Sequence, residues 1–173
     1  MKLTWFGGTT LRINTGGEIV VVDAEFAPSG VDKAELRSGA DHLATVSEGP
    51  IIDPAAWRPK PAPRATDAAS PVEIARIGPS ALLIAAAGEP ALVILGPGDL
   101  PRFGRWSDGA VIVLTSDRPS LIAEITALLD VSRPRLIALA VDGEFLDTAI
   151  DELSEHLDGA GLASLEPGLA LEV

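Results

Sequence analysis

The stretch MKLTWFGGTTLRINTGGEIVVVD, residues 1–23, decides the fold. Apolar and polar residues alternate over 3–5 and again over 11–13, which is the pattern of half-buried antiparallel strands. Thr15-Gly16-Gly17 supplies the positive φ angles that a tight hairpin turn requires. Residues 19–22 are β-branched on both faces, which is typical of a central, buried strand. The stretch predicts three short strands joined by tight turns, with the carboxylate of Asp23 at the end of the third.

The rest of the chain predicts a mixed sheet with helices packed outside it. Further strands are expected at residues 43–46, 72–77, 81–87, 91–95, 110–114, 136–141 and 169–173. Residues 120–129 and 145–157 carry apolar side chains at helical spacing, and both are expected to be amphipathic helices. Residues 31–38 could form one or two helical turns, or simply a connector.

Composition narrows the class of protein. The 173 residues predict a single domain over 1–173, and 47% hydrophobic residues favour a compact core. A net charge of −12 argues against nucleic acid and anionic membranes as partners. The absence of cysteine excludes disulfides, thiolate zinc sites and thiol catalysis. No signal-like or membrane-spanning segment is recognised, so we expect a cytoplasmic protein.

The order of these elements resembles the metallo-β-lactamase superfamily, in particular the branch of L-ascorbate-6-phosphate lactonase-like hydrolases. The resemblance is carried by Leu3–Gly7, Leu11–Ile13, Gly16-Gly17, Ile19–Asp23, Ala40-Asp41, Gly98-Asp99 and Pro167-Gly168. It implies an α/β (α+β) fold, a four-layer αββα sandwich, in a shortened form.

The family's metal-binding histidines are missing from the matching positions. Gly8 stands where the family has a histidine after the first strand, and residues 47–52 (SEGPII) stand where it has His-x-His-x-Asp-His. No histidine lies near residues 141–143, where the last metal-binding histidine belongs. Of the ligand set that the resemblance implies, only Asp99 remains.

The chain contains two histidines, His42 and His156. A hydrolytic zinc site typically needs three protein ligands, mostly histidine, and an open position for water. His156 lies in a charged amphipathic helix and is interpreted as a surface residue, while His42 next to Asp41 favours a structural or surface role. We therefore predict no catalytic residue, no metal site and no cofactor.

Residues at strand ends remain as candidates for contact with a ligand, because strand ends often converge on one rim. The candidates are Asp23, Ser47, Glu48, Asp99 and Asp142, and Asp53 is a further carboxylate that could contribute. Carboxylates could bind a hard cation such as Mg²⁺ or Ca²⁺. The alternative is that a chain with 25 acidic residues places some at strand ends by chance.

Residues 47–71 are rich in proline and are expected to form an extended surface loop in place of the family's metal-motif region. This loop is either a remnant or an arm that docks a partner. Trp5 is expected in the core. Trp57 and Trp106 lie in loop-like contexts, where they could form an interface such as that of a homodimer, or be partly buried under a loop.

These observations favour a pseudoenzyme: a non-catalytic protein with a binding, regulatory or scaffolding role toward a small molecule or a protein. The alternative is a small-substrate hydrolase with carboxylates in place of the histidines. The sequence names neither the ligand nor the partner.

Overall fold

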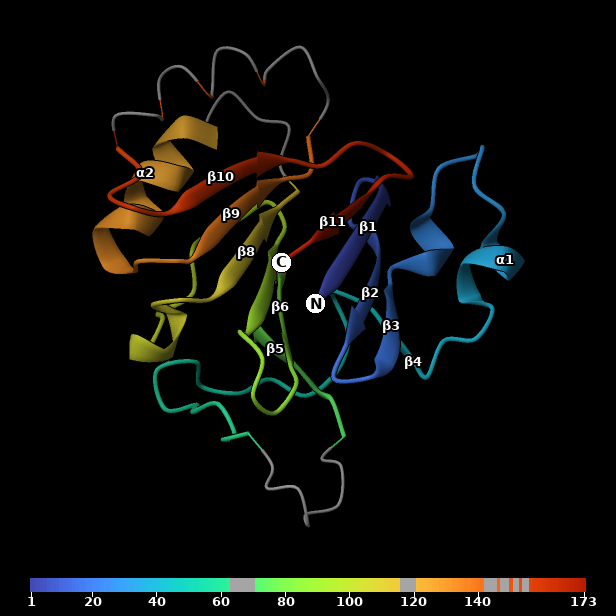
Figure 1. The fold of residues 1–173 in the computed structure, drawn as a ribbon, viewed down its shortest axis with the longest axis horizontal. Coiled ribbons are helices and arrows are strands. Elements are labelled where there is room, and N and C mark those ends of the chain that lie inside the picture. Colours follow the sequence, from blue (N-terminus) through green and yellow to red (C-terminus); the bar gives the residue numbers. More distant parts are fainter. Residues whose placement is uncertain (63–70, 116–120, 142–145, 147–149, 151–152, 154–155) are drawn as a thin grey trace.

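The computed structural model describes residues 1–62, 71–115, 121–141, 146, 150, 153 and 156–173, and it contains two β-sheets packed face to face (Figure 1). The first sheet has the strand order β11-β1-β2-β3-β4, and the second has the order β10-β9-β8-β7-β6-β5. The strands of the first sheet are β1 (Lys2–Gly7), β2 (Thr10–Thr15), β3 (Glu18–Val22), β4 (His42–Ala44) and β11 (Ala170–Glu172). Those of the second are β5 (Glu73–Gly78), β6 (Ala81–Ala85), β7 (Leu92–Leu95), β8 (Val111–Leu114), β9 (Leu136–Leu139) and β10 (Gly161–Ser164).

The first sheet contains the three strands that the opening residues predict. β1, β2 and β3 form an antiparallel meander, and Thr15 pairs with Glu18 across the hairpin turn. Gly16 and Gly17 adopt φ angles of 59° and 83° in that turn, a region that favours glycine. β4 then adds parallel to β3, and β11 pairs antiparallel with β1, so that the two ends of the chain lie side by side.

The second sheet combines an antiparallel and a parallel half. β5, β6 and β7 pair antiparallel, whereas β7, β8, β9 and β10 run parallel. β10 was not expected from the sequence, because GLAS carries no β-branched residue. It pairs with β9 over its whole length, from Gly161 opposite Leu136 to Ser164 opposite Leu139. Tertiary pairing therefore overrides a weak local preference at this strand.

Three apolar clusters stack these elements into layers. The cluster between the sheets contains side chains of both, such as Leu11 and Ile94, each fully buried. The helix α2 (Leu121–Val131) packs Leu128 against the outer face of the second sheet. The short helix α1 (Lys33–Arg37) packs Leu36 against Val21 on the outer face of the first sheet. The predicted four-layer order of helix, sheet, sheet and helix is confirmed, and each buried aliphatic side chain contributes about 1.5–3 kcal/mol to it.

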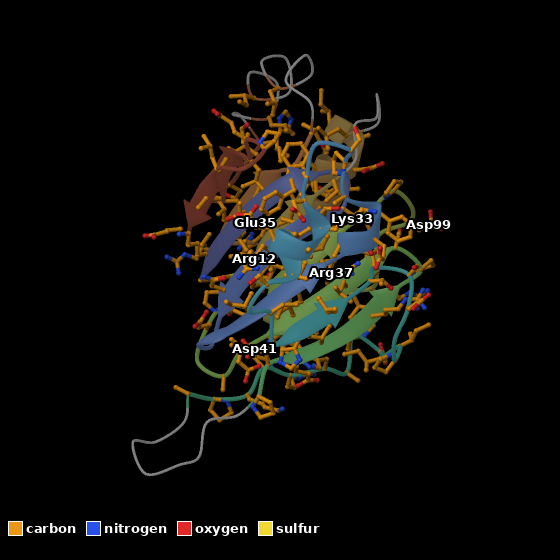
Figure 2. The ribbon with its side chains drawn as sticks, turned by 90° about the vertical axis from the view of Figure 1, so that its right-hand side faces the viewer. Arg12, Lys33, Glu35, Arg37, Asp41 and Asp99 are labelled. Carbon is orange, nitrogen blue, oxygen red and sulfur yellow. The ribbon has the colours of Figure 1, made fainter. Side chains whose placement is uncertain are left out.

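Residues 31–38 contain a helix rather than a plain connector. Asp32 caps its start, and Oδ1 accepts hydrogen bonds from the backbone N–H of Ala34 (2.8 Å) and of Glu35 (3.2 Å). The guanidinium of Arg12 on β2 donates to the carbonyls of Leu36 (2.6 Å) and Ser38 (2.9 Å). Capping at both ends stabilises this short helix. Figure 2 shows the face of the molecule on which α1 and Arg12 lie.

Two expectations fall largely outside the described residues. The helix predicted at 145–157 is described only at 146, 150, 153 and 156–157, and residue 120, the first of the helix predicted at 120–129, is not described. No helix within the described part of the chain is long and apolar enough to cross a membrane. Short 3₁₀ helices, η1 (Ala24–Phe26) and η2 (Arg105–Ser107), complete the described elements.

Candidate functional site

A recess of about 340 Å³ opens between the edge strands of the two sheets, β4 and β5. One wall comes from β4 and the loop that follows it, and the other from β5 and β6. The lining residues are His42, Leu43, Ala44, Thr45, Glu48, Gly49 and Pro50 on the first wall, and Ile74, Ala75, Arg76 and Leu82 on the second. Residues 48–50, which belong to the proline-rich segment 47–71, therefore form part of this recess.

Arg76 is the cation of the recess, and its position follows from the register of β5. It lies opposite Leu82 of β6, which is buried between the sheets, so Arg76 is on the inter-sheet face at the edge of the sandwich. Its Nη2 donates to the carbonyl of Pro79 at 3.0 Å, and its Nε is buried. Within the described residues, Nε has no hydrogen-bond acceptor and no carboxylate forms an ion pair with the guanidinium.

The backbone of Arg76 fixes the opposite wall. Its N–H donates to the carbonyl of Pro50 at 2.8 Å, and its carbonyl accepts from the N–H of Ile52 at 2.9 Å. These bonds add residues 50–52 to the edge of β5 like a short extra strand, with Ile51 bridged to Arg76. The loop after β4 is thereby held beside the guanidinium.

Glu48 is the anion of the recess. Its backbone N–H donates to the hydroxyl of Thr45 at 2.9 Å, which fixes the turn between them. The side chain is exposed, and no residue in the described part of the chain bonds its carboxylate. The two walls therefore present opposite charges that the described protein groups leave unpaired.

His42 lines the recess, but its side chain is engaged in a structural contact. Nε2 lies 2.6 Å from Oε2 of Glu18 on β3, and the same oxygen accepts from the N–H of Val72 at 3.3 Å. Glu18 therefore joins β4 to the residue where the chain enters the second sheet. This geometry agrees with the structural role predicted for His42.

Asp23, the first of the predicted rim residues, serves the fold. The side chain is 4% exposed, and the residue adopts a left-handed conformation with φ 50°. Its carboxylate accepts from the hydroxyl of Thr9 and from the N–H of Val46 (3.2 Å), while its carbonyl accepts from the hydroxyl of Thr10 (3.1 Å). The β1–β2 turn, the end of β3 and the segment after β4 are joined through this one residue.

Among the described rim candidates, Asp23, Glu48 and Asp99 form no group that could hold a metal ion. Ser47 is exposed beside Glu48, and of the described candidates only Glu48 lines the recess. Asp99 is exposed on the turn after β7, which is held by hydrogen bonds between Ser80 and residues 96 and 97. Figure 2 shows Asp99 at the margin of the molecule. Asp142 lies outside the described residues. Asp53 accepts from the N–H of Ala55 within its own turn.

The residues present do not fit the metal centre that the resemblance implies. Among the described residues, no three histidine or carboxylate side chains are grouped so that they could hold a metal ion. His42 and Asp23 each bond to other protein groups, and in the described part of the loop Glu48 is the carboxylate that lines the recess. No step of metal-assisted hydrolysis is derived from this arrangement.

The tryptophans show that part of the proline-rich segment, at Pro54 and Trp57, packs against the rest of the chain. Trp57 and Trp106 contact edge to face, with ring centroids 4.9 Å apart. Trp106 is 8% exposed, and its Nε1 donates to the carbonyl of Pro54 at 2.6 Å, while Trp57 Nε1 donates to Glu73 at 3.0 Å. The interface interpretation is wrong for Trp106, because its ring is buried under the chain's own loop.

Arg76 was missed by the sequence analysis. The signal was available, because a single arginine interrupts the otherwise apolar sequence IARI of residues 74–77. A cation in such a strand either reaches solvent at an edge or serves a site. The sequence alone did not show that this strand lies at the edge of its sheet and faces the loop that carries Glu48.

Comparison with known proteins gives a distant structural likeness. No family model matches the chain, and no curated protein sequence matches it. A similar solved structure is that of Igni18, described as a novel metallo hydrolase from the hyperthermophilic archaeon Ignicoccus hospitalis. It is 13% identical, the match covers 99% of this chain and 98% of that chain, and the TM-score is 0.49.

Proposed function

We propose that this chain is a non-catalytic binding protein with a regulatory or scaffolding role, built on a metallo-β-lactamase-like sandwich, and that the recess between β4 and β5 is its ligand site. The observation that carries the proposal is the pair of opposite, unpaired charges on its walls, Arg76 and Glu48. The buried Nε of Arg76 costs free energy while it lacks an acceptor, so the recess favours a ligand that supplies one, and the exposed carboxylate of Glu48 is available to a second charged group of that ligand.

The geometry favours binding over metal-assisted hydrolysis. Such hydrolysis needs several protein ligands grouped around one metal ion, and the described residues contain no such group. In the recess, His42 is bonded to Glu18, and Thr45 accepts from the backbone of Glu48. Asp23, the buried carboxylate at the end of β3, is bonded to Thr9 and Val46.

The volume favours a small molecule. Ligand pockets commonly span roughly 300–1,000 Å³, and the recess, at about 340 Å³, lies at the lower end. The apolar residues of both walls, such as Ala44, Ile74 and Leu82, would contact the body of the ligand, and the two charged residues would orient it.

A fragment screen by two-dimensional NMR tests this proposal. We expect binders to shift backbone amides of residues 44–50 and 74–76, while amides on the outer face of α1 stay unchanged. A parallel assay would offer phosphodiester, lactone and ester substrates with Mg²⁺, Mn²⁺ and Zn²⁺. Turnover that Asp99→Ala abolishes would refute the non-catalytic role and establish the carboxylate-based hydrolase instead.

A further inference from the structure

We propose that the recess binds a free α-amino acid with an apolar side chain, its carboxylate on Arg76 and its ammonium on Glu48; this inference rests on the proposed function. The two charged residues come from opposite walls of one recess, and an α-amino acid carries the two complementary charges on a single carbon. The apolar surface between the walls would take the side chain.

Arg76 fits a carboxylate because most of its donors are unused. A guanidinium carries five N–H donors in a planar fork, and the described residues accept from one of them, at Pro79. The buried Nε of Arg76 has no acceptor within the described part of the chain. An unsatisfied charged donor is costly, and a carboxylate can accept two parallel bonds from such a fork.

Glu48 fits an ammonium for the complementary reason. Its carboxylate has no bond to the described residues, and the turn that carries it is fixed by the hydrogen bond from the backbone N–H of Glu48 to the hydroxyl of Thr45. The same carboxylate disfavours a phosphate or another dianion, which Arg76 alone would have to neutralise.

The remaining lining selects the side chain of the amino acid. Leu82 is buried, and Ile74 packs against the core between the sheets, so the floor is apolar. The two other polar side chains of the recess are already engaged, because His42 contacts Glu18 and Thr45 accepts from Glu48. A branched aliphatic side chain therefore suits this floor better than a polar one.

NMR titration with three matched probes tests the inference. The probes are L-leucine, 4-methylpentanoate, which lacks the ammonium, and 3-methylbutan-1-amine, which lacks the carboxylate. We expect L-leucine to cause saturable chemical-shift changes in the amides of residues 44–50 and 74–76. Each truncated probe should bind at least about tenfold more weakly, because each loses one charge-assisted contact.

Variants separate the two contacts. We expect Arg76→Met and Glu48→Gln each to lower the affinity for L-leucine at least about tenfold. The matched controls, Arg102→Met and Glu35→Gln, change the same charges on exposed residues away from the recess and should bind as the unmodified protein does. If Arg76→Met does not fold, Arg76→Lys serves, since lysine keeps the charge but loses the bidentate fork.

The outcomes are distinct. The amino-acid inference would be overturned if L-leucine caused no amide shifts. It would also be overturned if 4-methylpentanoate bound as tightly as L-leucine and Glu48→Gln left the affinity for L-leucine unchanged. Fragments that bind the recess while L-leucine stays silent would overturn this inference and leave the proposed function standing. A screen in which no small molecule reaches the recess would overturn both.

Discussion

Replacing Asp23 tests whether this rim residue belongs to the fold or to a site. The substitutions are Asp23→Ala, which removes the carboxylate, and Asp23→Asn, which keeps one oxygen acceptor and tolerates a left-handed backbone. The carboxylate is 4% exposed and bonds to Thr9 and Val46. Because Asp23 holds three segments together, we expect its replacement to lower the free energy of unfolding and to have a smaller effect on ligand affinity.

The magnitude follows from the contacts. Two hydrogen bonds to a charged acceptor contribute about 1.5–3 kcal/mol each, with some recovery where water replaces the lost partner. The φ of 50° at this position adds about 1 kcal/mol for alanine. We expect Asp23→Ala to cost about 3–4 kcal/mol, a large share of the 5–15 kcal/mol of a typical domain. Asp23→Asn should cost only about 1 kcal/mol, because it keeps an acceptor for Val46.

Urea unfolding followed by circular dichroism measures both values. Asp99→Ala is the matched control, since that carboxylate is exposed on a strand-end turn, and it should change stability by less than about 0.5 kcal/mol. A double-mutant cycle with Thr9→Ala should return a coupling energy of about 1 kcal/mol. An Asp23→Ala variant within 1 kcal/mol of the unmodified protein, or an uncoupled cycle, would refute a structural role for this carboxylate.

Three further changes have defined outcomes. Trp106→Phe loses an indole hydrogen bond in a buried site and should cost about 1–3 kcal/mol in urea unfolding, whereas a neutral result would mean that the loop does not pack there. Gly16→Ala places a Cβ 2.7 Å from that of Ala86 at a φ of 59° and should cost more than Gly17→Ala, which has positive φ but open space; equal costs would count against the close contact. Burial alone would raise the pKa of Glu89, but hydrogen bonds from Thr15 and Gly16 and the amino group of Met1 hold that pKa below 4.5. The unfolded chain therefore binds more protons, so this stabilisation is present above about pH 4.5 and is lost as pH falls further; thermal melts of Glu89→Gln should show a smaller loss over that range, and an unchanged pH profile would contradict the assignment.

The sequence predicted the parts of the fold that local patterns control. Alternation and the double glycine predicted the opening meander, and helical spacing predicted α2. β10 escaped because GLAS has no strand signature and is defined by its partner β9. The packing of residues 50–57 escaped for a similar reason, since proline indicates irregular backbone but says nothing about which surface that backbone covers. Long-range pairing decided both.

The candidate site shows the same division. A carboxylate at the end of a strand looks alike in sequence whether it faces a ligand or its own backbone, so Asp23 was assigned to the rim although its acceptors are consumed by Thr9 and Val46. Glu48 was selected for the same reason and does line the recess. The two differ in their hydrogen-bond partners, which lie far apart in sequence.

The loop after β4 contributes one wall of the recess on which the proposed binding role rests. In the family that the sequence resembles, the corresponding loop supplies histidines; here it supplies Pro50 and Ile52, whose backbone groups bond to Arg76 and close the edge of β5. The same bonds hold the loop that carries Glu48 beside the recess that Arg76 also lines. The proposed binding role therefore depends on this pairing, because without it the segment that carries Glu48 would not be held at the edge of β5.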